Sequence, residues 1–388
     1  MREIYLDNSA STKISEEALE KYIEVSRTVY GNPSSLHNLG FLAEKELKYA
    51  REILLSSLSA KNSSVVFTAS GSEANNLAIL GRAFSKERYK RGAKIITTQG
   101  EHASVSATLS HLESLGFKLV SIPTINGELD FDALQRELDS SVILVTMMMV
   151  NNETGALYDT ARVSKLMKLK SPEAVLHIDA TQSFMKLKFT KASIGADMIS
   201  VSSHKIEGPK GVGALIIDDK LIKARGLAPV IYGGGQEGGL RSGTENVPGI
   251  AAFAEAVRIA AEGLSRNFEK LNSLREYFLE RLNEDSLREI SPTLPKLHAP
   301  HIINITLPKI KSETMLHYLS SLGIFVSSGS ACSSNSKSIS GALLAFGRSE
   351  KEADSSLRIS FGIQNTKEDV DALCEALISG LSKLARIS

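Results

Sequence analysis

The 388-residue chain is poor in cysteine and has no tryptophan, and its only cysteines are Cys332 and Cys374. Two cysteines build neither a disulfide framework nor a cysteine-based zinc site, so we expect no metal centre of that kind. The net charge of +1 gives no reason to expect nucleic acid or an anionic membrane as partner. No apolar run approaches the roughly 20 residues that cross a bilayer. Met1–Glu3 lead into Ile4 without a signal-peptide core. We therefore expect a cytoplasmic protein in a reducing setting, where a cysteine stays a free thiol.

From about residue 62, short apolar runs alternate with longer amphipathic stretches such as Glu73–Phe84 and Ser104–Leu115. The runs are Ser64–Thr68, Lys94–Thr98, Lys118–Pro123, Val142–Val150, Val175–Asp179, Met198–Ser202 and Gly213–Ile217. Strands that alternate with helices predict an α/β fold with a mostly parallel sheet. The runs are apolar at successive positions, which is typical of strands that helices cover on both faces.

The pattern changes near Asn246, which can cap a helix, with Pro248 suited to its first turn. We expect one helix over Ile250–Leu264, a charged helix over about Arg266–Leu282 and a last helix from about Lys367. Strand-like pieces lie between them, at His301–Leu307, Gly323–Ser327 and Leu357–Phe361. This second part of the chain predicts an α+β domain.

The segment around Lys205 is the most informative one. The apolar run Met198–Ser202 is followed by His204 and Lys205, and then by the glycine-rich stretch Gly208–Gly213. A lysine held in such a place can lose its charge to desolvation and become a nucleophilic amine. Amines of this kind form Schiff bases with aldehydes, of which pyridoxal phosphate is the commonest in proteins. The alternative is a strand-to-loop turn with a solvated lysine.

Two glycine-bearing segments are candidates for holding a phosphate. Thr68–Asn76 follows a strand and opens a helix, and its backbone N–H groups around Gly71 form an anion site or else an ordinary helix cap. Gly233–Gly239 contains a formal GxGxxG, but no helix starts directly after it and no ribose-binding acid follows, so we reject a dinucleotide site. Arg241–Thr244 closes that loop and offers polar groups for a phosphate.

Polar side chains at strand ends are further candidates. Asp179 ends a buried strand and needs a cationic partner such as a pyridinium nitrogen, unless it only caps the next helix. Gln182 could donate to a phenolate oxygen. His102 could stack on a planar cofactor and shuttle protons, or it could be structural.

Three more residues could act on a substrate. Asn152 follows the strongest apolar run and suits either a turn or the binding of a carboxylate or ring oxygen. Arg358, in an apolar strand, fits a substrate carboxylate or an internal salt bridge. Cys332 lies in the serine-rich stretch Ser327–Ser338, where an exposed thiol on a mobile loop can attack a substrate. Cys374 looks like a structural residue on a helix face.

Together these motifs resemble the NifS/IscS-type cysteine desulfurases, pyridoxal phosphate enzymes of fold type I in the aminotransferase class V group. The resemblance runs from Tyr5–Thr12 and Gly31–His37 to Leu357–Gly362. It implies a PLP-dependent transferase fold type I with a large domain, residues 14–256, whose mixed, mostly parallel sheet is flanked by helices. The implied small α+β domain comprises residues 1–13 and 257–388 and carries the Cys332 loop.

The resemblance also implies roles for individual residues. Lys205 would carry the cofactor as a Schiff base, with His102 stacked on its ring. The residues implied at the cofactor's polar groups are Asp179 at the pyridine nitrogen, Gln182 at the ring oxygen, and Gly71, Ser72, Ser202 and His204 at the phosphate. Thr244 matches a residue that reaches the phosphate of the neighbouring subunit, which implies a homodimer with shared sites.

The implied reaction removes sulfur from L-cysteine and gives L-alanine and a persulfide on Cys332. Asn152 and Arg358 would contact the substrate carboxylate, Asn152 also lying at the cofactor. The persulfide sulfur would pass to an iron–sulfur scaffold or a sulfur-carrier protein, and the sequence does not identify which. A selenocysteine lyase would share nearly every motif, an aminotransferase would not need Cys332, and a non-enzymatic scaffold would keep only a relic site. The chain departs from the family at Glu207, where an aromatic residue is expected.

Overall fold

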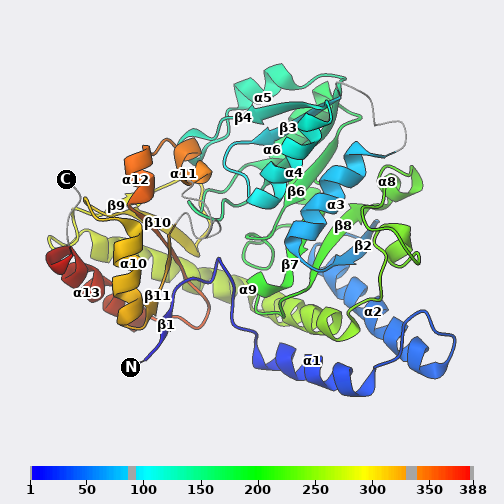
Figure 1. Ribbon diagram of the computed structural model, residues 1–388, viewed down its shortest axis with the longest axis horizontal. Coiled ribbons are helices and arrows are strands. Elements are labelled where there is room, and N and C mark those ends of the chain that lie inside the picture. Colours follow the sequence, from blue (N-terminus) through cyan, green and yellow to red (C-terminus); the bar gives the residue numbers. More distant parts are fainter. Residues whose placement is uncertain (1, 86–92, 329–338, 385–388) are drawn as a thin grey trace.

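The computed structural model describes residues 2–85, 93–328 and 339–384. Its largest feature is a seven-stranded sheet in the order β2-β8-β7-β6-β5-β3-β4 (Figure 1). The strands are β2 (Ser63–Thr68), β3 (Lys94–Thr98), β4 (Lys118–Ile122), β5 (Val142–Met148), β6 (Val175–Asp179), β7 (Met198–Ser202) and β8 (Gly213–Asp218). Only β8 runs antiparallel to its neighbours, β2 and β7. The predicted α/β fold with a mixed, mostly parallel sheet is confirmed.

Helices cover both faces of this sheet (Figure 1). One face is covered by α3 (Gly71–Ala83) and α4 (Ala103–Ser114), and the other by α1 (Glu16–Thr28), α2 (Asn38–Ser57), α6 (Thr160–Lys170) and the first half of α9 (Val247–Leu282). Because side chains alternate across a strand, Ile95 of β3 packs with α3 and α4, while Ile96 packs in the core on the opposite face.

Short helical elements connect the larger ones. They are η1 (Ile125–Gly127), α5 (Phe131–Glu137), α7 (Lys191–Ile194), η2 (Ser203–Lys205), α8 (Asp219–Lys223) and η3 (Glu237–Gly239). The 3-10 turn η2 follows β7 directly and ends at Lys205. It therefore holds that lysine at the carboxyl end of a central strand.

A second, smaller core lies beside the large sheet (Figure 1). Its strands are β9 (Ser291–Thr293), β10 (Ile302–Thr306), β12 (Ser327–Ser328) and β13 (Ser356–Ser360) in one antiparallel sheet, and the parallel pair β1 (Ile4–Tyr5) and β11 (Ile324–Phe325). The helices of this part are α10 (Ser312–Ser321), α11 (Gly341–Phe346), α12 (Glu350–Asp354) and α13 (Lys367–Lys383). Phe278 and Phe361 meet edge to face at its centre, with ring centroids 6.3 Å apart.

The long helix α9 joins the two cores. It is one continuous helix of 36 residues that begins after the predicted cap Asn246, so the prediction of two separate helices is wrong. Pro248 lies at its first turn, where it breaks no hydrogen bond, and no proline follows within the helix. The division into residues 14–256 and residues 1–13 with 257–388 stays a prediction. No helix in the described part of the chain is both long and apolar enough to cross a membrane.

Candidate active site

A cavity of about 270 Å³ opens where β5, β6 and β7 end. The carboxyl ends of parallel strands form the ligand crevice in open α/β sheets. The predicted site residues that line it are Gly71, Ser72, His102, Asn152, Asp179, Gln182, Ser202, His204, Lys205 and Arg358. Thr244 lies elsewhere, and Cys332 falls outside the described residues. The fold thus brings together groups that are up to 287 positions apart in the numbering, from Gly71 to Arg358.

The Lys205 amine points toward the N-terminal segment of the chain. Its Nζ donates to the main-chain carbonyl oxygens of Ser9 at 2.5 Å and Ala10 at 2.8 Å. The same Ser9 oxygen accepts from Nε2 of Gln182 at 2.9 Å, while the buried Oε1 of Gln182 has no partner among the described residues. Ser9 therefore holds the lysine and the glutamine side by side, a role that no sequence motif indicated.

Asp179 ends β6 and is only 6% exposed. Its Oδ2 accepts from Nδ2 of Asn75 at 2.7 Å, and its Oδ1 accepts from the backbone N–H of Thr181 at 2.9 Å. No ion pair within the described residues involves this carboxylate. A buried anion that has neutral donors but no cation favours a cationic group on a ligand.

His102 stands at the N-terminus of α4. Its Nδ1 accepts from the backbone N–H of Ser104 at 3.2 Å and lies 2.8 Å from the Ser104 hydroxyl. Burial lowers the pKa of His102, against the opposing influence of Asp179, so the ring is neutral at physiological pH. The predicted structural role is thus present, and it leaves Nε2 available because the cap uses Nδ1 only.

The N-terminus of α3 forms the other end of the cavity. Ser70 caps it by accepting from the Glu73 N–H at 3.1 Å. A Cβ placed on Gly71 would lie 3.2 Å from the Ser202 Cβ, a tight contact, so the close approach here favours glycine. The Ser202 hydroxyl is buried and has no hydrogen-bond partner among the described residues. Burial and Lys205 lower the pKa of His204 beside it to about 4, so that ring is neutral.

The internal salt bridge that the sequence suggested for Arg358 is present, and its contact with a substrate carboxylate stays a prediction. Its Nη2 pairs with Asp7 Oδ1 at 2.9 Å, and its Nη1 donates to the Asn152 carbonyl at 3.0 Å. The buried Nε has no partner among the described residues, although the guanidinium lines the cavity. The internal salt bridge therefore leaves the Nε–H of Arg358 for a ligand. Asn152 lies within the turn that follows β5, and Asn151 Oδ1 fixes this turn by accepting from the Glu153 and Thr154 N–H groups.

Sequence reasoning missed Glu101, which lies under the site next to His102. Both of its oxygens accept from the Met148 N–H at 3.0 Å, and the Thr98 hydroxyl donates to it. Burial raises the pKa of Glu101 from 4.5 to about 8. The carboxyl ties the end of β3 to the end of β5. The one sequence signal for Glu101 is its position directly after a strand, and many surface glutamates share that position.

We expect Glu101→Gln to flatten the pH dependence of stability. The folded protein holds the Glu101 proton up to about pH 8, whereas an unfolded chain releases it near 4.5. The folded state thus binds more protons in this window, so its stability falls as pH rises from about 4.5 to 8, by a few kcal/mol. Urea unfolding at pH 5.5 and 7.5 measures this change. The exposed Glu113→Gln serves as control, and an unchanged slope in Glu101→Gln would contradict the assignment.

Thr244 lines a different cavity, beyond β2, together with Glu237 and Arg241. Glu237 is held there by a two-pronged ion pair with Arg51, with both N–O distances at 2.8 Å. The prediction that Thr244 reaches the phosphate site of a neighbouring subunit stays a prediction. In its own chain Thr244 does not line the Lys205 cavity.

A lysine, a buried carboxylate and a helix N-terminus meet at the strand ends of this fold, an arrangement that suits a pyridoxal phosphate enzyme. The family model described as aminotransferase class-V matches residues 4–373. The chain therefore belongs to the aminotransferase class V family.

Named relatives match over the full length. The chain is 35% identical to "Cysteine desulfurase IscS" of Dictyoglomus turgidum, over 100% of this chain and 96% of the relative. A solved structure named "NIFS-like protein" superposes with a TM-score of 0.90 at 34% identity, covering 99% of this chain and 100% of the other. A second, titled "SspA in complex with cysteine", gives a TM-score of 0.79 at 32% identity, covering 94% of this chain and 100% of that one. The resemblance seen in the sequence is confirmed.

Proposed function

We propose that this enzyme is a cysteine desulfurase, which converts L-cysteine to L-alanine and leaves the sulfur as a persulfide on Cys332. The observation that supports it most is that Lys205 and Asp179 line the same cavity. The Asp179 carboxylate accepts from neutral donors there, and within the described residues it forms no ion pair. The relatives named for this activity, and the solved relative in complex with cysteine, support the choice of substrate.

The residues present fit pyridoxal phosphate. The unpaired Ser202 hydroxyl and the first N–H groups of α3 suit its phosphate. Asp179 suits a protonated pyridine nitrogen, and Gln182 retains a second N–H for the ring oxygen. Lys205 suits its aldehyde carbon. When bound, this group supplies an electron sink for bonds at the substrate α-carbon.

The chain's own residues would bind the substrate and move its protons. Arg358 would donate Nε–H to the cysteine carboxylate, beside its ion pair with Asp7. The Lys205 amine would take the α-proton at Nζ, and the neutral His102 ring would accept the thiol proton at Nε2. The Cys332 thiolate would attack the substrate sulfur, so that an S–S bond forms while the C–S bond breaks. The electron pair of the broken bond would stay with the carbon fragment, which would take up the protons held by Lys205 and His102 and leave as alanine.

A homodimer is part of this proposal. Large apolar side chains are exposed near the start of α2, among them Tyr30 at 72%, Leu36 at 106% and Phe41 at 64%. A second copy of the chain would cover them. Thr244, which lies outside its own chain's cavity, would then serve the partner's phosphate site.

The sulfur would leave on a scaffold for iron–sulfur clusters or on a sulfur-carrier protein in the cytoplasm. A selenocysteine lyase is the alternative that shares the same residues. A desulfurase should turn over cysteine, because the Cys332 thiolate accepts its sulfur, whereas a selenocysteine lyase should turn over selenocysteine faster than cysteine. Comparing the turnover of the two substrates separates the two activities.

Incubation with L-cysteine tests the proposal. We expect equimolar L-alanine and a gain of about 32 Da, one sulfur atom, on the peptide that contains Cys332. Cys374 is the internal control, since it is buried and burial raises its thiol pKa to about 12. Alanine formed without the mass gain would favour a lyase, pyruvate formed from alanine would favour an aminotransferase, and no turnover would contradict the proposal.

A further inference from the structure

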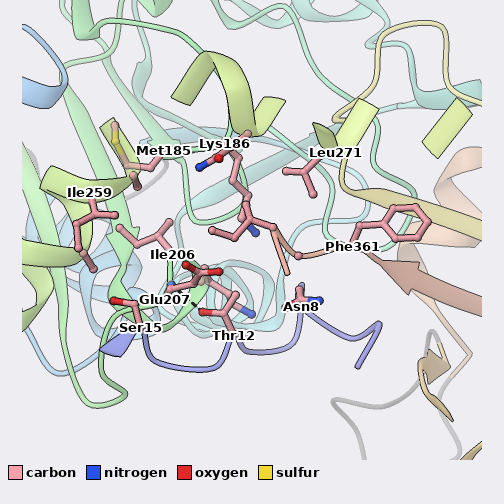
Figure 2. Close-up of a pocket in the computed structure, with 16 residues that line it drawn as sticks. Asn8, Thr12, Ser15, Met185, Lys186, Ile206, Glu207, Ile259, Leu271 and Phe361 are labelled. Carbon is pink, nitrogen blue, oxygen red and sulfur yellow. Dashed lines mark hydrogen bonds between the residues drawn. The ribbon is translucent and has the colours of Figure 1, made fainter. Parts of the chain in front are cut away.

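Lys205 also lines a second cavity, which Asp179 does not line. Figure 2 shows its lining, with Met185 and Lys186 on one side and Glu207, Thr12 and Asn8 on the other. Ile206, Ile259, Leu271 and Phe361 supply an apolar wall. Lys205 is the one residue that lines both this cavity and the active-site cavity. The proposed reaction uses nothing else here.

Lys186 places a buried side-chain amine in this cavity. Its Nζ is buried and has no hydrogen-bond partner among the described residues. Burial, with Lys205 as a like charge nearby, lowers the pKa of Lys186 to about 7. A buried ammonium without an acceptor is costly, and a carboxylate placed beside it would remove that cost.

Glu207 brings the opposite charge. It is the position where the family resemblance led us to expect an aromatic residue, and the thinner glutamate side chain leaves room that a ring would fill. Burial raises the pKa of Glu207 while Lys186 lowers it. Yet no Glu207 oxygen lies within 4.0 Å of the Lys186 nitrogen, so the two groups influence each other across the cavity without forming an ion pair.

The backbone around the cavity is constrained. Met185 and Glu207 both adopt positive φ angles, 56° and 64°, which non-glycine residues rarely do. The Glu207 conformation is fixed by its N–H, which donates to the Thr12 hydroxyl at 2.7 Å. Such strained residues gather at ligand clamps more often than elsewhere, and here two of them face one cavity.

The size of the cavity limits the occupant. The space open to the centre of a water molecule is about 60 Å³, so the occupant must be a small molecule. One with a charge of each sign and a short aliphatic body would bridge Lys186 and Glu207 and contact Ile206 and Ile259.

We propose that this cavity binds a small aliphatic α-amino acid as a zwitterion, with its carboxylate at Lys186 Nζ and its ammonium group at the Glu207 carboxylate. The bound carboxylate restores the charge on Lys186, so binding takes up protons. The other charged groups that act on this pair are Lys205 and Arg358 on Lys186, and Glu17 on Glu207. Because Lys205 borders both cavities, an occupant would also contact Lys205, the lysine of the proposed reaction.

Calorimetric titration with L-valine tests the proposal on the protein as purified and after borohydride treatment. Borohydride fixes a cofactor on Lys205 and so blocks the exchange with an amino acid that the proposed function requires, while the Lys186 and Glu207 side chains stay unmodified. We expect L-valine to bind both forms. Isovalerate and isobutylamine, which each lack one of the two charges, should bind at least about tenfold more weakly. At pH 8, titrations in two buffers of different ionisation heat should show proton uptake.

Variants with matched controls decide the assignment. Lys186→Met and Glu207→Gln should each weaken L-valine binding about tenfold or more, and Lys186→Met should also lose the proton uptake. The exposed Lys188→Met and Glu113→Gln should bind within about twofold of the parent protein. The proposal is overturned if L-valine does not bind at millimolar concentration, if Lys186→Met binds it equally well, or if isobutylamine binds as tightly. L-valine should bind this cavity whether or not the protein carries a cofactor. The titration would therefore still test this proposal if the proposed desulfurase function were wrong.

Discussion

Lys205→Ala is expected to lower the rate of alanine formation from cysteine by about 10³-fold or more. The variant loses both the amine that would hold the cofactor and the base that would take the α-proton. Freshly purified parent protein should be yellow and the variant should not. Alanine assayed under single-turnover conditions and the visible absorption spectrum measure the two losses together.

Lys210→Ala is the matched control, because Lys210 is an exposed lysine on the same glycine-rich segment. We expect it to keep the colour and most of the activity. Supplying the vitamer separates a missing cofactor from a missing site. A parent protein that stays colourless with added pyridoxal phosphate would contradict the whole interpretation of Lys205.

Asp179→Asn should be the second largest effect, a fall in kcat of on the order of 10²–10⁴. The amide keeps the shape and can still accept from the Thr181 N–H, but it carries no charge to hold a proton on a ring nitrogen. Removing the charge also removes the influence that raises the pKa of His102. The His102 pKa should therefore fall further, which NMR of the imidazole ring can follow.

Asp132→Asn, at an exposed position on α5, controls for the loss of one negative charge. A structural role for Asp179 would appear as lost stability without a change in the spectrum of the bound cofactor. Equal kcat values in Asp179→Asn and the parent would rule out the predicted contact between Asp179 and the ring nitrogen.

Strand patterns predicted the central sheet well, because the inner strands β3, β5, β6 and β7 are buried at every position and read as apolar runs. Lys94–Thr98, Val175–Asp179 and Met198–Ser202 agree with β3, β6 and β7. The run Val142–Val150 was too long, since β5 ends at Met148 and the Met149 N–H then bonds the Asp179 carbonyl. Hydrophobicity alone does not separate a strand from a buried segment that follows it.

The predicted site residues that line the cavity were found partly from polar residues at strand ends, such as Asp179 and Lys205, and partly from the family resemblance, as for Ser72, Ser202 and His204. Asn75 and Ser9 were missed, although they hold Asp179 and Lys205. Their contacts depend on which strands become neighbours and on where the N-terminal segment crosses the sheet. Neither the order of the strands nor the path of the N-terminal segment can be read from the spacing of nearby residues. Only the tertiary structure shows that Asn75 and Ser9 reach the site.

The N-terminal segment links Lys205 to strand β13. Asp7 pairs with Arg358, Asn8 donates to the Ser360 carbonyl at 3.0 Å, and the carbonyl groups of Ser9 and Ala10 accept from Lys205. The site therefore joins segments that are made early, midway and late during synthesis. We expect it to be complete only after the ribosome has added β13.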